Sequence, residues 1–397
     1  MTLPDRALQD EMVAFRRDVH RHPELSEQER RTAGQVCAFL ERHGIPYREG
    51  VAGTGVVAEI PGRAAGPVVA LRADLDALPI REETGLPFAS SVDGVMHACG
   101  HDGHAAMLLG AGTLLAREGD LPTPVRLVFQ PAEEVGKGAR AMIEAGVLRD
   151  VAMIFGGHLD RHYPTGTLVV TEGPVNASTD RFRIEISGRG GHGARPHETV
   201  DAVVVGSLLV MAIQTIVSRE VNPAHPSVIS VGRFDAGSAG NVIAGRATLE
   251  GTIRTQHPEV REHLKRSLRR IGASVGQLHG AGVVVELTPG VPVLVNTPEM
   301  AALAREAAVG VAGADHVRPL ETANMGGEDF ACYLEQVPGA YVRFGARGPG
   351  MEGVPAHSSR WDFDEAALAV GAAWYRAVAR EAGRRLSAGQ ARGASRT

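Results

Sequence analysis

The sequence predicts an α/β fold of two domains. The larger one contains a mostly parallel β-sheet, and a smaller ferredoxin-like βαββαβ domain is inserted into it. Short apolar runs alternate with helical patterns in the first half of the chain and again near its end. The middle of the chain follows a different order of elements. With 397 residues, 44% of them hydrophobic, the chain has enough apolar side chains to fill more than one core.

The larger domain is predicted from residues 1–180 and 292–397. Its strands are expected at 55–60, 68–71, 125–130, 151–155 and 340–344, with helices between them at 104–117 and 138–145. Strands that alternate with helices are typical of a parallel sheet, because parallel neighbours need a long crossover connection.

The inserted domain is predicted from residues 181–291. Its elements are expected as a strand at 181–187, a helix at 199–219, strands at 228–234 and 247–255, a helix at 258–278 and a strand at 283–287. This β-α-β-β-α-β order is that of a ferredoxin-like domain. Because the chain on both sides has the α/β pattern, we expect an insertion rather than a separate terminal domain.

Composition excludes several functional classes. The formal net charge of −5 gives no field that would attract nucleic acid or an anionic membrane. The three cysteines, Cys37, Cys99 and Cys332, form no disulfide framework. The N-terminus lacks the apolar core of a signal peptide, and the longest apolar stretch, 202–217, is interrupted and short for a membrane span. We therefore expect a soluble, cytoplasmic protein with neither nucleic acid nor membrane as a partner.

Acidic and histidine side chains follow four of the predicted strands. In chain order they are Asp74 and Asp76, Glu133 and Glu134, His158, and His357. In open α/β sheets, ligands bind outside the carboxyl ends of the strands. The sequence therefore predicts a polar site at one edge of the larger sheet.

A second group of polar residues lies between these strands. His97, Cys99, His101, Asp102 and His104 fall within eight residues. The nearby glycines predict a turn there, with a helix beginning just after it. Thiolate and imidazole together suit Zn²⁺ and similar metals. Alternatively, Cys99 is a small buried apolar residue and the histidines pack or cap the helix. The carboxylates expected nearby favour metal binding for Cys99 and His101, whereas His97 and His104 are interpreted as structural.

The adjacent pair Glu133–Glu134 suggests a division of roles. Neighbouring side chains in extended backbone point in different directions, so one can bind a metal while the other faces a metal-bound water. A general base beside an activated water is what amide hydrolysis needs. The alternative is a solvated acidic turn before a helix. The position of the pair at a strand end favours the catalytic interpretation.

Eight motifs, in order along nearly the whole chain, resemble a known group of enzymes. They are DVHRHPELS (18–26), LRADLDALPI (71–80), HACGHDGHAAMLLGA (97–111), VFQPAEEVGKGARAMIEAG (128–146), GRGGHGARPHETVDA (188–202), GNVIAG (240–245), GGEDFACY (326–333) and AHSSRWDFDE (356–365). The sequence resembles the metal-dependent aminoacylase and carboxypeptidase superfamily, and within it the amidohydrolase branch. That branch includes hippurate hydrolases, N-acyl-amino-acid amidohydrolases and auxin-conjugate hydrolases.

The resemblance implies a site for two divalent ions, with Zn²⁺, Mn²⁺, Co²⁺ and Ni²⁺ all open. The implied ligands are Cys99, His101, Glu134, His158 and His357. Glu133 is then the general base, and Asp76 orients a ligand rather than binding metal. Which ligand bridges the two ions stays open at this point.

The resemblance also implies three roles in the inserted domain. His192 would stabilise the oxyanion, often in the site of a partner subunit, and Asn241 and Arg254 would contact the substrate. Each has a simpler interpretation: His192 and Asn241 as turn residues, and Arg254 as a surface residue of a strand. The same resemblance implies a homodimer or higher homo-oligomer.

The predicted function is metal-dependent hydrolysis of N-acyl amino acids, in which a metal-activated water cleaves the bond between an acyl group and an amino acid. One alternative is a dipeptidase or aminopeptidase with the same di-metal site. Another is a metal-free binding protein on the same fold. The acyl group and the stereochemistry of the amino acid are not predicted.

Overall fold

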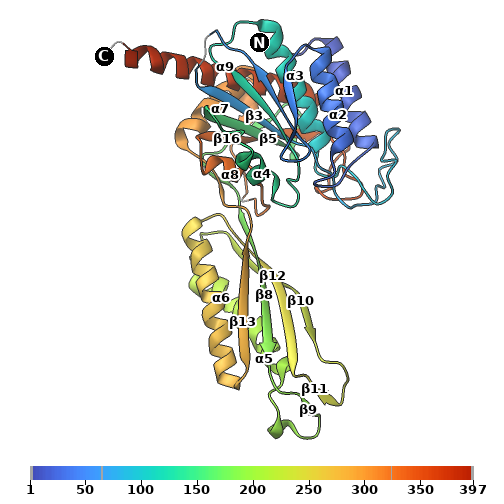
Figure 1. Ribbon diagram of the computed structural model, residues 1–397, viewed down its shortest axis with the longest axis vertical. Helices are drawn as coiled ribbons and strands as arrows, with labels where there is room; N and C mark the ends of the chain where they lie inside the picture. Colours follow the sequence, from blue (N-terminus) through green and yellow to red (C-terminus); the bar gives the residue numbers. More distant parts are fainter. Residues whose placement is uncertain (1–2, 64–65, 323, 395–397) are drawn as a thin grey trace. The chain divides into compact units, whose positions relative to one another are not determined.

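The computed structural model describes residues 3–63, 66–322 and 324–394, which form two compact units. The first unit is Met1–Gly173, Val295–Glu321 and Asp329–Thr397, and the second is Pro174–Leu294 and Thr322–Glu328. The second unit thus contains the whole of the predicted insertion, 181–291, together with short segments on either side of it. The predicted α/β class, with an inserted domain, is confirmed (Figure 1).

The first unit is built on an eight-stranded sheet. In spatial order its strands are β1 (Tyr47–Val51), β2 (Gly55–Ile60), β4 (Val125–Gln130), β3 (Val68–Asp74), β5 (Val151–Pro164), β16 (Gly339–Arg347), β6 (Leu168–Val169) and β15 (Val317–Arg318). The four central strands, β4, β3, β5 and β16, are parallel to one another. All five strands predicted for this domain lie in this sheet.

Strand β5 is longer than predicted, because the prediction ended where two glycines begin. A Cβ at Gly156 would lie 2.8 Å from the ring of Phe330, and one at Gly157 would lie 2.5 Å from the ring of Phe344. The glycines therefore admit aromatic rings against a continuing strand. As a result His158 lies inside β5, opposite Arg343 of β16, and not after the strand as predicted.

Helices pack with the sheet around one large apolar core. They are α1 (Arg6–Arg21), α2 (Arg30–Arg42), α3 (His101–Glu118), α4 (Gly138–Glu144), α7 (Pro298–Ala312), α8 (Ala331–Leu334) and α9 (Ala366–Ala394), with a short 3-10 helix at Ala314–His316. Helix α3 contacts α1, α9 and β3 and is buried along most of its length. A helix that is apolar on all sides is typical of the centre of a core.

Helix α3 begins earlier than predicted. The turn expected across residues 97–104 ends at Gly100, whose φ of +97° suits glycine, and the helix starts at His101. A Cβ at Gly100 would lie 2.7 Å from Trp361, and one at Gly103 would lie 2.6 Å from Phe363. The glycines here allow close packing of the helix start, and His101 and His104 both lie in the first turn of α3.

The second unit has the predicted ferredoxin-like order. Its elements are β8 (Ser178–Ser187), α5 (Ala202–Thr215), β10 (Ser227–Ala236), β12 (Arg246–Thr255), α6 (Pro258–His279) and β13 (Gly282–Pro289). The sheet order is β10-β12-β8-β13, with antiparallel neighbours throughout. Smaller elements are β9 (Gly191–His192), a 3-10 turn (Pro196–Glu198), a π-helical turn (Ile216–Glu220) and β11 (Val242–Ile243). Strands β7 (Gly173–Asn176) and β14 (Leu294–Asn296) lie where the chain passes from one unit to the other.

Helix α5 carries apolar side chains on two faces. One face packs on the sheet of the second unit through Val205, Leu209 and Ile213. The other, here named the α5 apolar face, exposes Val203, Val204, Leu208 and Met211, the last with 69% of its surface accessible. By length and composition alone, Ala202–Glu220 is the one helix in the described chain that could cross a membrane, a property shared by core helices of soluble proteins.

A buried ion network joins α1 to the start of α3. The Arg16 guanidinium, fully buried, donates from Nε to Asp102 Oδ2 over 2.9 Å and also pairs with Asp362 and Glu365. His20 Nδ1 lies 2.9 Å from the same Asp102 oxygen. Although burial alone would raise it, the charges of Arg16 and His20 hold the pKa of Asp102 well below its usual range. This network fixes the helix turn that carries His101.

We expect Arg16→Met to destabilise the first unit by about 3–5 kcal/mol, because it removes the guanidinium from the buried Asp102 carboxylate and leaves only His20 to offset that charge. Arg17→Met is the matched control. Arg17 is the next residue, also pairs with Glu365, and is 49% exposed, so its loss should cost less than about 1 kcal/mol. Both tryptophans, Trp361 and Trp374, lie in the first unit, so tryptophan fluorescence during urea unfolding reports on this unit. Equal losses for the two variants would contradict the prediction.

Candidate active site

The structure brings all five predicted metal ligands together in the first unit. Cys99 lies just before α3 and His101 in its first turn, Glu134 follows β4, His158 lies in β5, and His357 lies in the loop after β16. The donor atoms of these five residues form two groups of three, and within each group all atoms lie within 4.8 Å of one another. One group is Cys99, His101 and His158, and the other is Cys99, Glu134 and His357. Cys99 belongs to both groups, and these five residues would hold the metal ions.

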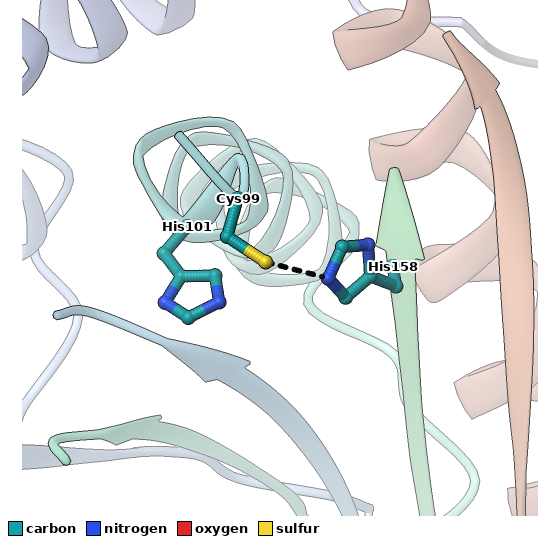
Figure 2. Close-up of side chains that lie close together, drawn as sticks. All are labelled: Cys99, His101 and His158. Carbon is teal, nitrogen blue, oxygen red and sulfur yellow. Dashed lines mark hydrogen bonds between the residues drawn. The ribbon is translucent and has the colours of Figure 1, made fainter. Parts of the chain in front are cut away.

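The donor atoms point toward one another. Figure 2 shows the Cys99 thiol directed at His158, with 3.2 Å between Sγ and Nε2, and the His101 ring beside them. His101 Nε2 lies 3.8 Å from Glu134 Oε1, and His357 Nε2 lies 3.6 Å from the same oxygen. His101 Nε2 and Glu134 Oε1 are buried and have no hydrogen-bond partner among the residues that the structure describes. Buried polar atoms without partners indicate a missing ligand, and these donors fit divalent metal ions.

The neighbouring histidines differ from His101 in how their nitrogens are used. His101 Nδ1 lies 2.8 Å from the backbone oxygen of Asp76, which leaves Nε2 facing the donor groups. In His104, Nδ1 lies 2.6 Å from Asp74 Oδ1 and Nε2 accepts the Leu159 N–H over 2.9 Å. Both nitrogens of His104 are therefore occupied within the protein. His97 is fully buried, and burial lowers its pKa to about 4, so it stays neutral.

Asp76 holds the turn that carries the two glutamates. Its Oδ1 accepts the N–H of Glu133 over 3.1 Å, and its Oδ2 accepts that of Glu134 over 3.0 Å. Ser26 also donates its hydroxyl to Asp76 Oδ2 over 2.6 Å. Both oxygens of the Asp76 carboxylate thus accept hydrogen bonds that orient other groups. The Glu133 carboxylate lies next to His101 and Glu134 and accepts the backbone N–H of Asp329 over 3.3 Å.

Burial sets the protonation of the donors before any metal binds. It raises the pKa of Glu134 to about 7 and raises that of the Cys99 thiol well above its usual range. Burial, helped by the neighbouring His104, lowers the pKa of His158. The Cys99 thiol and the His158 imidazole are therefore neutral before metal binds, whereas the nearby Asp74 raises the pKa of His101. A divalent ion must displace the thiol proton as it binds.

The three residues predicted in the inserted domain all lie in the second unit, but not together. His192 in β9 is opposite Val242 of β11, and the Gly193 N–H donates to the Asn241 carbonyl over 2.9 Å, so His192 and Asn241 are neighbours. The His192 side chain is exposed. Arg254 lies near the far end of β12, where it donates to the carbonyl of Met325 over 3.0 Å. Within this unit Arg254 is therefore remote from the other two.

Two buried carboxylates at the site were not predicted from the sequence. Asp329 accepts from Arg72 over 2.8 Å and from the Ala139 N–H over 2.8 Å, and its own N–H contacts Glu133. Asp329 lies in the motif GGEDFACY, and this position is the sequence signal by which it could have been predicted. Glu29 accepts the Ala132 N–H over 2.9 Å. It follows the motif DVHRHPELS closely, but nothing in its local pattern distinguishes it from an exposed helix-start residue.

Fold and site together define a metal-dependent hydrolase of the α/β structural class. A thiol, three imidazoles and the Glu134 carboxylate converge on the parallel strands of one sheet, in two donor groups that share Cys99, and the adjacent Glu133 carboxylate lies next to His101 and Glu134. Residues 70–381 match the sequence profile of peptidase family M20/M25/M40, and the chain belongs to this family.

Similar proteins span nearly the whole chain. A Bacillus subtilis (strain 168) protein named N-acetylcysteine deacetylase is 41% identical over 379 residues, covering 95% of this chain and 98% of the relative. Thermostable carboxypeptidase 1 of Saccharolobus solfataricus is 40% identical over 373 residues, covering 92% of this chain and 94% of the relative. The crystal structure of the Bacillus subtilis YXEP protein, described as a dinuclear metal-binding peptidase of family M20, matches with a TM-score of 0.85 at 38% identity, over 96% of this chain and 99% of that chain. The chain is thus a hydrolase of amide bonds with a site for two divalent ions.

We expect Cys99→Ser to weaken metal binding by at least about tenfold. Removing a residue that only hydrogen-bonds to a metal ligand already weakens binding by about that factor. Cobalt-loaded protein should also lose its sulfur-to-cobalt charge-transfer absorption. Cys332→Ser is the matched control, because Cys332 is likewise a buried free thiol of the first unit but lies in α8. Metal analysis and absorption spectra check both variants. An unchanged cobalt spectrum in Cys99→Ser would show that this sulfur is not a ligand.

Proposed function

We propose that the protein hydrolyses N-acyl amino acids to a carboxylic acid and a free amino acid. The observation that carries this proposal is the position of Glu133. Its carboxylate lies beside the donor groups of His101 and Glu134, with one oxygen oriented by the Asp329 N–H. Cys99, His101, Glu134, His158 and His357 would hold the ions. When bound, two divalent cations make a water molecule more acidic and polarise the amide carbonyl.

In this proposal Glu133 moves the protons of the reaction. It removes a proton from the attacking water and returns it to the nitrogen of the departing amino acid. Asp76 keeps Glu133 and Glu134 on a fixed turn, so that one carboxylate serves as base while its neighbour binds metal. His104, whose two ring nitrogens are occupied by Asp74 and by the Leu159 N–H, takes no part in proton transfer.

The substrate class is supported by the relative named N-acetylcysteine deacetylase. The relative named thermostable carboxypeptidase supports a second candidate, cleavage of unblocked peptides by the same site. The thiol and imidazole donors suit Zn²⁺, and Mn²⁺, Co²⁺ or Ni²⁺ are the other candidates. The free thiols Cys37, Cys99 and Cys332 fit a reducing compartment, and we propose that the protein works in the cytoplasm.

We expect Glu133→Gln to keep the metal content of the wild type but to lower kcat by about 10²- to 10⁴-fold, because it removes the base and leaves the ligands in place. Glu134→Gln is the contrasting variant, since it should lose metal as well as activity. Both are assayed for amine release from acetyl, benzoyl and longer N-acyl amino acids and from free dipeptides, with Mn²⁺ or Zn²⁺ added. Cleavage of the dipeptides alone would overturn the proposed substrate class and favour the peptidase alternative.

We also propose a homodimer formed through the α5 apolar face, with His192 acting in the site of the partner. An uncovered apolar helix face of this kind is typical of a protein interface. The His192 side chain is exposed, so it can enter the site of a partner subunit. There it would donate to the developing oxyanion.

Mixing two inactive variants tests the proposed dimer. We expect Glu133→Gln and His192→Ala to be inactive alone but to regain up to about a quarter of wild-type activity after co-refolding, because half of the dimers then hold one intact composite site. Met211→Glu should give monomers in sedimentation, whereas Val309→Glu, which changes an exposed apolar residue of α7, should not. Absence of recovery from a confirmed mixed dimer would rule out action across the interface.

A further inference from the structure

Glu29 is a fully buried carboxylate in an unusual place. It is the N-cap residue of α2, where a side chain ordinarily accepts N–H groups of its own helix and faces solvent. Glu29 makes no such capping bond. Instead Glu24 caps the helix, accepting the N–H of Arg31 over 3.0 Å and that of Thr32 over 2.8 Å. The helix start is therefore satisfied without Glu29.

The Glu29 side chain is directed at the turn that precedes the catalytic pair. Its Oε1 accepts the N–H of Ala132 over 2.9 Å and that of Glu27 over 3.0 Å. Its Oε2 accepts the hydroxyl of Thr54 over 2.6 Å. A buried glutamate is rare unless its oxygens are satisfied, and here three donors satisfy them.

Ala132 needs such support. Its φ of +57° lies in the left-handed region, which a residue other than glycine adopts only when its surroundings hold it there. Its carbonyl accepts the N–H of Gly138 over 3.0 Å, which closes the turn. Three successive N–H groups, those of Ala132, Glu133 and Glu134, are thus held by two buried carboxylates, Glu29 and Asp76.

We propose that Glu29 is a positioning residue for the hydrolytic reaction: by holding the Ala132 turn, it sets the directions of Glu133 and Glu134. This inference rests on the proposed function only for the role of Glu133 as base. The three donors that Glu29 accepts from are all neutral groups, and burial raises its pKa. We therefore expect the placement of its acceptor oxygens to matter, and not its negative charge. An isosteric amide can keep Oε1 on the two backbone N–H groups and turn its NH₂ group toward the Thr54 oxygen.

Three variants separate positioning from general stabilisation. We expect Glu29→Ala to lower kcat by about 10²-fold with little change in KM, because displacement of a catalytic group by about 1 Å costs that much. Glu29→Gln should stay within a few fold of the wild type. Glu24→Ala, the matched control, removes the cap of the same helix without touching Ala132, so it should lower stability but not kcat.

A second readout is independent of turnover. In metal-free protein, amide hydrogen exchange across residues 132–134 should be faster in Glu29→Ala than in the wild type and unchanged in Glu24→Ala. If the wild type cleaves no N-acyl amino acid, the proposed function fails, while the exchange measurement still decides the role of Glu29. Equal kcat losses in Glu29→Ala and Glu24→Ala, or equal damage in Glu29→Gln and Glu29→Ala, would overturn the proposal.

A milder variant covers the case in which Glu29→Ala does not fold. Thr54→Val keeps the shape of the side chain and removes the donor to Glu29 Oε2. We expect a decrease in kcat of about 3- to 10-fold, as for the loss of one hydrogen bond, together with faster exchange at residues 132–134. Unchanged exchange and unchanged kcat in this variant would contradict the proposed role.

Discussion

A single buried carboxylate, Asp76, joins three segments of the first unit, two of which carry proposed metal ligands. It accepts the N–H groups of Glu133 and Glu134, the hydroxyl of Ser26, and lies 3.3 Å from His101 Nδ1. Because these segments come from the N-terminal loop, the start of α3 and the end of β4, a shift in any one of them changes the hydrogen bonding of the others. The directions of one metal ligand and of the proposed base thus depend on the same side chain.

Keeping charged side chains inside a protein is costly, and the first unit offsets this cost for Arg72 by placing two carboxylates against it. Arg72 lies between Asp74 at 2.6 Å and Asp329 at 2.8 Å, all three buried beneath the sheet edge. Removing one partner of such a set leaves an uncompensated charge, which is far more costly than the pair itself. The result is a site in which the donors of each group of three already lie within 4.8 Å of one another, so that metal binding requires little rearrangement of the chain.

Local sequence patterns predicted what is local in the structure. The strands of the main sheet and the βαββαβ order were predicted because apolar periodicity reports directly on burial. The end of β5 and the start of α3 were wrong because glycines at 100, 103, 156 and 157 were interpreted as breaks, whereas they make room for aromatic rings distant in sequence. The donor cluster was predicted from strand ends and from the resemblance. The part played by Glu29 was not, since its partner Ala132 lies 103 positions away and no local pattern indicates that contact.

The burial of Cys99 has a consequence for the protein before it acquires metal. Oxidants attack the thiolate form of cysteine, and a thiol whose pKa is raised by burial stays protonated at neutral pH. The low-dielectric surroundings of Cys99 therefore protect its sulfur from oxidation before metal binds. The same surroundings strengthen the bond between this sulfur and a cation. We therefore expect the Cys99 sulfur of the metal-free protein to react only slowly with oxidants.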